Sequence, residues 1–544
     1  AAVARPAEPS HSALVSAANP LAAAAGLEML KAGGSAADAA AATMLALTVV
    51  EPQSSGIGGG GFLAYQPPSG KLVTIDGRET APAVASSRQF LKADGTPLSF
   101  ADAATGGRSV GVPGNIRLIA EAHKRWGKLP WARLFDPAIR LAEGFTVSPA
   151  LARFAAFGRD GVSKDPQASA LYLPGGQPVA AGTRLANPAL AATLRTIAKA
   201  GPDAFYKGEI ARAIVAKVNG AANNPTKMTA ADLAGYKVQV RAPVCGKYRV
   251  WTVCGMGPPS SGAVGVLQML GQLQSFDLKG LGPDSPVAWH LFAESQRLAY
   301  ADRDKWLGDP GFVKVPVAGL IAPAYIAARG GLIATDKRIA KAEAGMPAGA
   351  PPRQAANDNE VAGTTNFAVA DKAGAMLTYT STVERTFGSG LVAGGFVLNN
   401  ELTDFNFSPA DQGALAANRV QPGKRPRSSM SPTIVYDAKG KAILAIGAAG
   451  GTTIIAQVAK AIIGVLDWGL PVQDAIALPQ LFAIDNRLAV EKGSKLEALI
   501  PALQALGHTP VAATLPLKLN GVERTATGWR GGADPRSEGQ VLGY

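Results

Sequence analysis

The chain has 544 residues, 47% of them hydrophobic and 17% charged, so it holds enough apolar material for a large core and lacks the composition of a disordered protein. Its formal net charge of +13 would suit nucleic acid if the basic residues were clustered. They are spread along the chain, and the one dense cluster, KRPR at residues 424–427, has no aromatic residues beside it. We therefore expect no nucleic-acid partner and a general attraction to small anionic substrates.

The hydrophobic windows are too short to cross a bilayer. The longest, residues 39–50, is mostly Ala and follows Asp38, so we expect no membrane span. The first residues, AAVARPAEP, lack a basic and apolar leader. We expect that a signal peptide has already been removed from this numbering.

The first predicted elements are two helices that approach each other closely. Asn19 followed by Pro20 marks a helix start, and the Ala-rich run after it should be helical up to a Gly-Gly pair. Ser35 can cap a second helix that ends near residue 50. Glycines 58–61 follow a helix rather than a strand and precede no Lys-Ser or Lys-Thr, so they predict tight backbone packing rather than phosphate binding.

The rest of the chain mixes helical and strand periodicity, without an internal repeat. Helical patterns lie at residues 114–126, 131–143, 187–200, 262–273, 286–302 and 453–467. Strand patterns lie at residues 71–76, 237–240, 248–253, 367–371, 376–382, 433–437 and 442–446.

The only cysteines, Cys245 and Cys254, lie in two short β-rich runs that would bring them opposite each other. Both a cross-strand disulfide and two unpaired half-buried thiols fit this pattern. No His or Cys residues lie nearby at zinc spacing. We expect no metal and no cofactor.

The sharpest compositional boundary lies at Gly363. Residues 342–363 are rich in Ala, Gly, Pro and Asn and should neither pack nor form regular structure. The sequence then changes to TTNFAVAD, where Phe367 and Val369 alternate with small residues as in a strand. A strand that begins at Thr364 after a cleavable tether is what a self-processing enzyme with an N-terminal nucleophile requires.

Cleavage before Thr364 would leave a free α-amine beside its hydroxyl. A threonine hydroxyl is a poor nucleophile until a base takes its proton, and an α-amine with a pKa of about 7.7 to 8.0 is partly neutral near pH 7. The four histidines are scattered, and none lies between Thr364 and the next glycine-rich motif. One residue would then supply both nucleophile and base; an ordinary strand-starting threonine is the alternative.

An ordered series of motifs follows Thr364: Thr382, Glu384, LNNELTDF (398–405), PGKRPRSSMSPT (422–433) and GAAGGTT (447–453). The N-terminal half adds NPLAAAAGLEMLKAGGSAADAAAAT (19–43), EPQSSGIGGGGF (51–62) and DGRETAP (76–82). Together they resemble the γ-glutamyltranspeptidase family over nearly the whole chain. The resemblance implies an α+β fold, the αββα sandwich of N-terminal nucleophile hydrolases, with two stacked antiparallel sheets between helical layers.

Three further positions match catalytic groups of that family. Gly450 and Gly451 fall between a predicted strand and helix, where backbone N–H groups can meet negative charge, and the resemblance assigns them the oxyanion hole. Thr382 matches a second threonine that hydrogen-bonds the amine or hydroxyl of the nucleophile. Without the resemblance, Gly450 and Gly451 would be only a tight strand-to-helix connection, and Thr382 only a strand residue.

Six positions match the pocket that binds a γ-glutamyl donor, whose α-carboxylate and α-ammonium need donors and a counter-charge. Arg78, Ser428 and Ser429 match the groups that hold the carboxylate. Asp404 matches the acid that receives the ammonium, with Glu401 beside it. Two positions depart from many family members: Glu384 stands where they carry Asn, and Glu401 where some carry Gln, which resembles a subset of bacterial members and acylase-like relatives.

The resemblance implies a hydrolase and transferase that cleaves γ-glutamyl amides such as glutathione and passes the acyl group from Thr364 to water or an amine. Self-cleavage would give a large subunit of residues 1–363 and a small catalytic subunit of residues 364–544, joined as a heterodimer in one intertwined unit. The expected location is the bacterial periplasm or medium. The alternatives are a glutaryl or cephalosporin acylase of the same family, and an unprocessed exported binding protein for anionic ligands.

Overall fold

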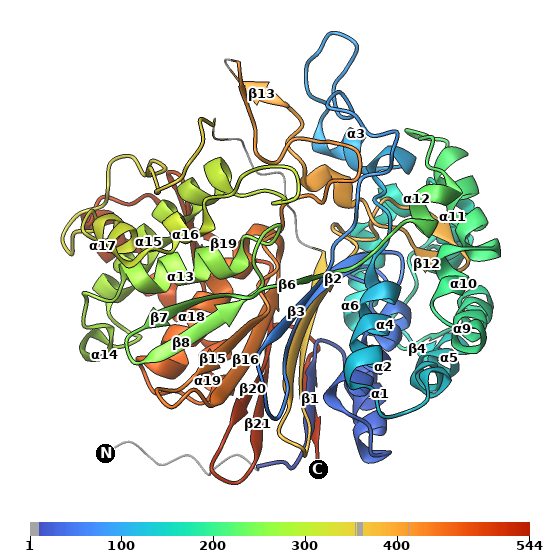
Figure 1. Cartoon of the computed structure of the whole chain (residues 1–544), viewed down its shortest axis with the longest axis horizontal. Coiled ribbons are helices and arrows are strands. Elements are labelled where there is room, and N and C mark those ends of the chain that lie inside the picture. Colours follow the sequence, from blue (N-terminus) through green and yellow to red (C-terminus); the bar gives the residue numbers. More distant parts are fainter. Residues whose placement is uncertain (1–9, 354, 356–362, 412) are drawn as a thin grey trace.

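The computed structural model describes residues 10–353, 355, 363–411 and 413–544. Within these ranges, two large antiparallel sheets are stacked between helices (Figure 1). The seven-stranded sheet has the order β22 (Gln540–Gly543), β1 (Leu14–Ala17), β9 (Thr364–Ala370), β10 (Met376–Thr382), β2 (Gly60–Gln66), β3 (Val73–Gly77) and β6 (Gln239–Arg241). The six-stranded sheet has the order β21 (Trp529–Ala533), β20 (Lys518–Arg524), β16 (Ala442–Ala449), β15 (Thr433–Tyr436), β8 (Trp251–Gly255) and β7 (Val244–Tyr248).

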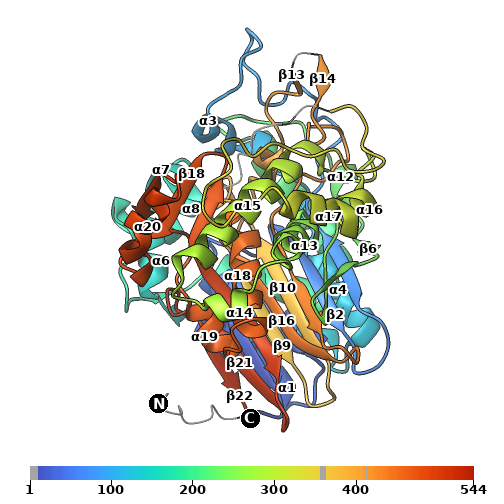
Figure 2. The same cartoon turned by 90° about the vertical axis from the view of Figure 1, so that its left-hand side faces the viewer.

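Helices cover the outer face of each sheet, which confirms the predicted αββα sandwich. The first sheet is covered by α1 (Pro20–Lys31), α2 (Ala36–Val50), α4 (Asn115–Trp126), α5 (Asp136–Ala142) and α9 (Pro188–Ala200), on the right in Figure 1. The second is covered by α13 (Gly262–Gln272), α15 (Pro286–Trp306) and α18 (Ile454–Leu466), and Figure 2 looks onto this layer. Each sheet contains strands from residues 1–363 and strands from residues 364–544.

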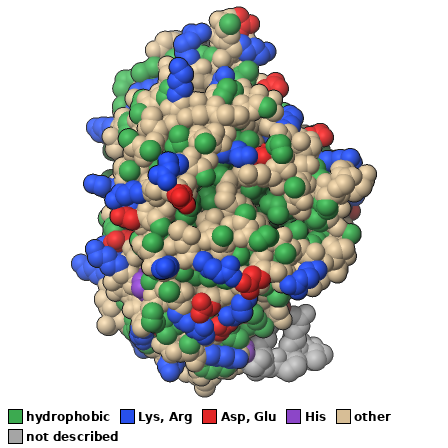
Figure 3. All heavy atoms as spheres, turned by 90° about the vertical axis from the view of Figure 1, so that its right-hand side faces the viewer, with side chains coloured by type: hydrophobic (Ala, Val, Ile, Leu, Met, Phe, Trp, Pro, Cys, Tyr) green, Lys and Arg blue, Asp and Glu red, His purple; other side chains and the backbone are tan. Residues whose placement is uncertain are grey.

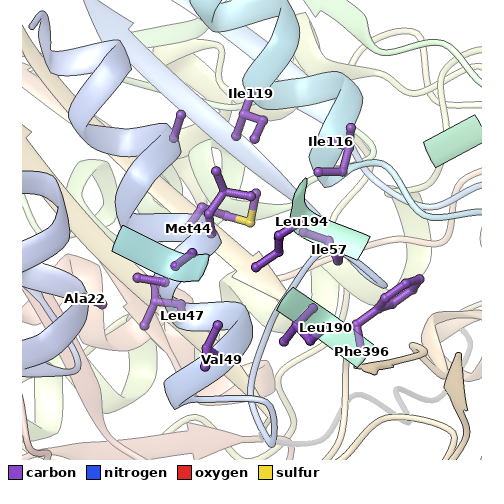
Figure 4. Close-up of a cluster of buried hydrophobic side chains, with 14 of the residues drawn as sticks. Ala22, Met44, Leu47, Val49, Ile57, Ile116, Ile119, Leu190, Leu194 and Phe396 are labelled. Carbon is purple, nitrogen blue, oxygen red and sulfur yellow. The ribbon is translucent and has the colours of Figure 1, made fainter. Parts of the chain in front are cut away.

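The two N-terminal helices begin where their caps predict. The Asn19 side chain accepts a hydrogen bond from the Leu21 N–H, and Ser35 forms a capping box with Asp38. Their close approach requires Gly26, because a Cβ there would lie 2.3 Å from Thr43 Oγ1. The buried side of α2 packs through Met44 and Leu47 against residues of α4 and α9 (Figure 4).

Glycines 58–61 serve tight packing, as predicted. A Cβ on Gly59 would lie 1.9 Å from the Thr382 carbonyl oxygen, and one on Gly61 would lie 2.5 Å from that of Thr380. Strand β2 can therefore pair with β10 only because these residues lack side chains.

Two predicted elements are wrong in detail. The helix expected at residues 131–143 is a 3₁₀ turn, η2 (Trp131–Phe135), followed by α5, and the break falls just before Pro137, which has no N–H to continue the first helix. The strand expected at residues 248–253 is interrupted by the turn of a hairpin: Tyr248 ends β7, residues 251–253 belong to β8, and Arg249, with a φ of 51°, lies in the turn between them. That hairpin places Cys245 opposite Cys254, and the two form a disulfide.

The tether before Thr364 is only partly as expected. Its described part contains no helix or strand, but the expectation that it would not pack is wrong for its first residues. The Gly345 N–H donates to Asp302 at 2.8 Å, and the Trp306 indole donates to the Gly345 carbonyl oxygen at 3.1 Å. Residues 354 and 356–362 lie outside the described residues.

Lysine and arginine side chains are scattered over the face shown in Figure 3, among hydrophobic and neutral ones. Among the described helices, none combines the length and hydrophobicity that crossing a membrane requires.

Candidate active site

Two neighbouring strands bring the predicted nucleophile and its partner threonine together. Thr364 is the first residue of β9 and pairs with Thr382, the last residue of β10. Their hydroxyl oxygens lie 3.1 Å apart. Thr364 is 7% exposed and Thr382 2%, so both hydroxyls lie in a largely dry environment.

The hydrogen bonds around Thr382 determine where its proton lies in the undivided chain. Its hydroxyl is 3.3 Å from the Gly363 carbonyl oxygen, which can only accept, so the single Thr382 proton points at that oxygen. The Glu384 N–H donates to Thr382 Oγ1 at 2.8 Å. The Thr364 hydroxyl must then donate to the remaining lone pair of Thr382. This arrangement directs the proton of Thr364 away from the carbonyl group that its oxygen would attack.

Gly450 and Gly451, the residues predicted for the oxyanion hole, lie at the C-terminal end of β16 and the start of a helical turn. Both have positive φ, 135° and 59°, a backbone conformation that favours glycine. A Cβ on Gly450 would also lie 2.0 Å from the Pro516 carbonyl oxygen. Gly450, Gly363 and Thr364 line the same pocket.

The predicted donor-binding residues form a buried cluster around Arg78. Arg78 directly follows β3, is 1% exposed, and forms ion pairs with Glu401 and Asp404 of the short helix η4 (Glu401–Asp404). It also donates to the Arg427 carbonyl oxygen at 2.8 Å. The Arg78 main-chain N–H donates to the Asp76 carboxylate at 2.8 Å, and that carboxylate forms ion pairs with Arg241 and Arg425.

Ser428 and Ser429 lie in the connection that leads into β15, and both are fully buried. The hydroxyl of Ser429 accepts a hydrogen bond from Arg303 at 2.8 Å, and that of Ser428 accepts one from the Met430 N–H at 3.1 Å. Arg303 comes from α15 and was not predicted from the sequence.

Glu384 joins the threonine pair to the Arg78 cluster. Its N–H donates to Thr382, and its carboxylate accepts a hydrogen bond from the Asn400 side chain. Asn400 directly precedes Glu401 and η4. Glu384 has a φ of 80°, in the left-handed region, so the turn after β10 is held against its backbone preference. Hydrogen bonds therefore connect the threonine pair, through Glu384 and Asn400, to the start of the helix that carries Glu401 and Asp404.

Glu79 was missed by the sequence analysis although it lies within DGRETAP. It is fully buried beside Arg78, and burial raises its pKa to about 8, against the opposing effect of the Arg78 charge. Glu79 is therefore mostly protonated near neutral pH, which limits the negative charge around Arg78.

Two histidines contact each other elsewhere in the fold: His290 Nδ1 lies 2.7 Å from His508 Nε2. Neither lines the pocket of Thr364. Within the described ranges, no group of three or more His, Cys, Asp or Glu side chains is placed to hold a metal ion.

Comparison with known proteins connects this geometry to a family. Residues 22–544 match the family described as gamma-glutamyltranspeptidase. The chain is 36% identical to a "Glutathione hydrolase proenzyme" of Bacillus subtilis (97% of this chain, 91% of the relative) and 38% identical to that of Escherichia coli (89% and 83%). It is also 38% identical to an "Acylase ACY 1 proenzyme" of a Pseudomonas species (91% and 86%).

The chain also matches solved structures of a cephalosporin acylase and a gamma-glutamyltranspeptidase. The chain matches a cephalosporin acylase from Bacillus halodurans with a TM-score of 0.88 and 28% identity, covering 100% of this chain and 98% of that one. It matches the gamma-glutamyltranspeptidase of Helicobacter pylori with a TM-score of 0.59 and 35% identity, covering 62% and 95%.

Proposed function

Because the chain belongs to the γ-glutamyltranspeptidase family, we propose that it is a self-processing γ-glutamyl hydrolase and transferase. The observation that carries the proposal is the contact of Thr382 with both the Thr364 hydroxyl and the Gly363 carbonyl oxygen. One hydroxyl thereby reaches the attacking atom and the oxygen of the bond to be cleaved.

In the processing step, Thr364 Oγ1 attacks the Gly363 carbonyl carbon. The proton of Thr364 passes to Thr382, whose own proton meets the negative charge that develops on the Gly363 oxygen. The C–N bond then breaks, the Thr364 nitrogen takes a proton, and water hydrolyses the resulting ester. The products are chains of residues 1–363 and 364–544, which remain together because each sheet contains strands of both chains.

In the mature enzyme, the free α-amine of Thr364 takes the proton from its own hydroxyl as the oxygen attacks a γ-glutamyl amide. The N–H groups of Gly450 and Gly451 stabilise the oxyanion. The leaving amine receives the proton, and an acyl ester on Thr364 remains. Water or a second amine then attacks the ester, which releases the γ-glutamyl group and restores the hydroxyl.

The Arg78 cluster provides the groups that a γ-glutamyl donor needs. The donor α-carboxylate binds Arg78, Ser428 and Ser429, while Asp404 and Glu401 receive the α-ammonium. In the substrate-free molecule the two acids pair with Arg78 itself. Substrate therefore exchanges one set of buried ion pairs for another, which leaves no charge of the cluster unpaired.

The relatives named as acylases support a second candidate, a glutaryl or cephalosporin acylase. Such donors lack the α-ammonium, so Asp404→Asn should spare their turnover while it lowers that of a γ-glutamyl anilide. We further propose a periplasmic or secreted location.

Release of 4-nitroaniline from γ-glutamyl-4-nitroanilide tests the proposal. Purified wild-type protein should release the amine, and Thr364→Ala should not. Equal release by both proteins, or none by a wild type that has cleaved itself, would contradict it. Glutaryl-4-nitroanilide, measured in parallel, distinguishes the two candidates.

A further inference from the structure

The pocket of Thr364 contains a cation that the proposed mechanism does not use. Lys518 lines this pocket together with Thr364 and Gly450, and its side chain is 16% exposed. Its ammonium lies 3.1 Å from a carboxylate oxygen of Glu51 and 3.4 Å from the Ser54 hydroxyl. An ammonium has three N–H donors, so these two contacts hold Lys518 in place and leave one donor for a ligand.

Lys518 lies on the other side of Gly450 from the donor-binding serines. Strand β16, which ends just before Gly450, lies between β20 and β15 and is antiparallel to both. Its C-terminal end is therefore level with the first residues of both neighbours. In β20 the first residue is Lys518, which pairs with Ala449. Ser428 and Ser429 precede the first residue of β15.

In the seven-stranded sheet, the donor-binding residue Arg78 lies in the same direction from the nucleophile. Strand β9 of this sheet, which carries Thr364, packs against β20, and β2 packs against β15. Arg78 follows β3, which lies beyond β10 and β2 from β9. Arg78 therefore lies on one side of Thr364 in the seven-stranded sheet, and the six-stranded sheet has the donor-binding serines on the same side of Gly450 and Lys518 on the other. A donor held by the Arg78 cluster with its carbonyl carbon at Thr364 thus directs its leaving amine toward Lys518.

The remaining walls of this pocket are partly apolar. Phe154, from α6 (Pro149–Phe157), and the Pro516–Leu517 segment face the same space as Lys518. A ligand that fits these walls carries an apolar side chain next to a negative charge, and its reacting nitrogen lies toward Thr364. An α-amino acid or short peptide with a free carboxylate has this chemistry.

We propose that Lys518 binds the carboxylate of the amine that leaves or accepts the γ-glutamyl group, and so makes the enzyme selective for amino acid and peptide amines. This proposal rests on the proposed function. During transfer, the acceptor nitrogen bonds to the acyl carbon, the ester C–O bond to Thr364 breaks, and the proton of the acceptor returns to Thr364 Oγ1 through the α-amine. Lys518 takes no part in these bond changes and acts on the position of the acceptor alone.

The test compares amines with and without a carboxylate. Glycylglycine and glycylglycinamide serve as acceptors, and γ-glutamyl-3-carboxy-4-nitroanilide and γ-glutamyl-4-nitroanilide serve as donors. Lys518→Met should lower the ratio of kcat/KM for the carboxylated over the neutral member of each pair by about tenfold, the size expected for a hydrogen bond to a charged group. The loss should lie mainly in KM, and Lys518→Arg should restore most of the ratio.

The exposed Lys439 provides the matched control, and Lys439→Met should keep the wild-type ratio. A ratio that Lys518→Met leaves unchanged, while both donors are still turned over, would overturn the subsite and leave the proposed function standing. No turnover of either donor by processed wild type would contradict the proposed function and the subsite with it.

A measurement on wild type alone covers the case in which the Lys518→Met chain does not process. As an acceptor, glycylglycine should be half-saturating in transfer from the neutral anilide at a concentration about tenfold lower than its amide. Equal half-saturating concentrations would overturn the proposal.

Discussion

Replacing Thr382 by valine removes one hydroxyl and keeps the size and branching of the side chain. The hydroxyl makes three contacts: to Thr364 Oγ1 at 3.1 Å, to the Gly363 carbonyl oxygen at 3.3 Å and to the Glu384 N–H at 2.8 Å. Thr382→Val removes all of them. Thr382→Ser keeps the hydroxyl and is the matched control.

Thr382→Val should lower both the stability of the chain and the rate of self-cleavage. The Glu384 N–H loses its acceptor in a buried site, which should cost about 1 to 3 kcal/mol of stability. The Gly363 oxygen loses its donor as negative charge develops there, and loss of one such donor slows related reactions by about 10² to 10³-fold. The rate of self-cleavage should therefore fall much further than the modest change in stability explains.

The assay follows conversion of freshly purified precursor into two chains on denaturing gels, with thermal unfolding of both variants in parallel. We expect Thr382→Val to process about 10² to 10³-fold more slowly than wild type and Thr382→Ser to stay within about tenfold of it. Processing of Thr382→Val at the wild-type rate would refute the role given to this hydroxyl.

Three further predictions concern groups around the site and the fold. Gly450→Ala, whose Cβ would lie 2.0 Å from the Pro516 carbonyl oxygen, should abolish anilide hydrolysis, whereas Gly440→Ala, also at a positive φ but in open space, should retain it. Because burial raises the pKa of Glu79 to about 8, the folded chain holds a proton there that the unfolded chain loses near pH 4.5, so this stability is lost as pH rises between these values. The thermal unfolding midpoint of Glu79→Gln should fall less between pH 5 and pH 8 than that of wild type. An equal fall of the midpoint in both proteins would contradict this. Replacing Cys245 and Cys254 by serine should cost about 2 to 3 kcal/mol of stability in thermal unfolding, from the chain entropy of the short loop, and leave hydrolysis intact, since the pair joins the edge hairpin of the second sheet.

Sequence periodicity predicted most elements because each carries a local signal. Asn19 and Ser35 cap the helices that they were expected to cap, and the alternation after Thr364 identifies β9. The errors occur where a signal can be read in two ways. Residues 248–253 are as β-rich as a single strand, but the positive φ of Arg249, which turns the chain from β7 into β8, is not visible in the residue type.

The site was predicted to the extent that its residues lie in recognisable motifs. The contact of Arg78 with Glu401 and Asp404 joins residues more than 300 positions apart, and the motif order alone indicated it. Glu79, Arg303 and Lys518 were missed because burial and the pairing of distant strands, not local pattern, bring them to the site.

The most direct test of the account is the intact mass of the active protein together with the N-terminal sequence of its fragments. Wild type should give two chains, the smaller beginning TTNFAVAD, and Thr364→Ala should give one. Active wild-type protein that consists only of the undivided 544-residue chain would contradict the account.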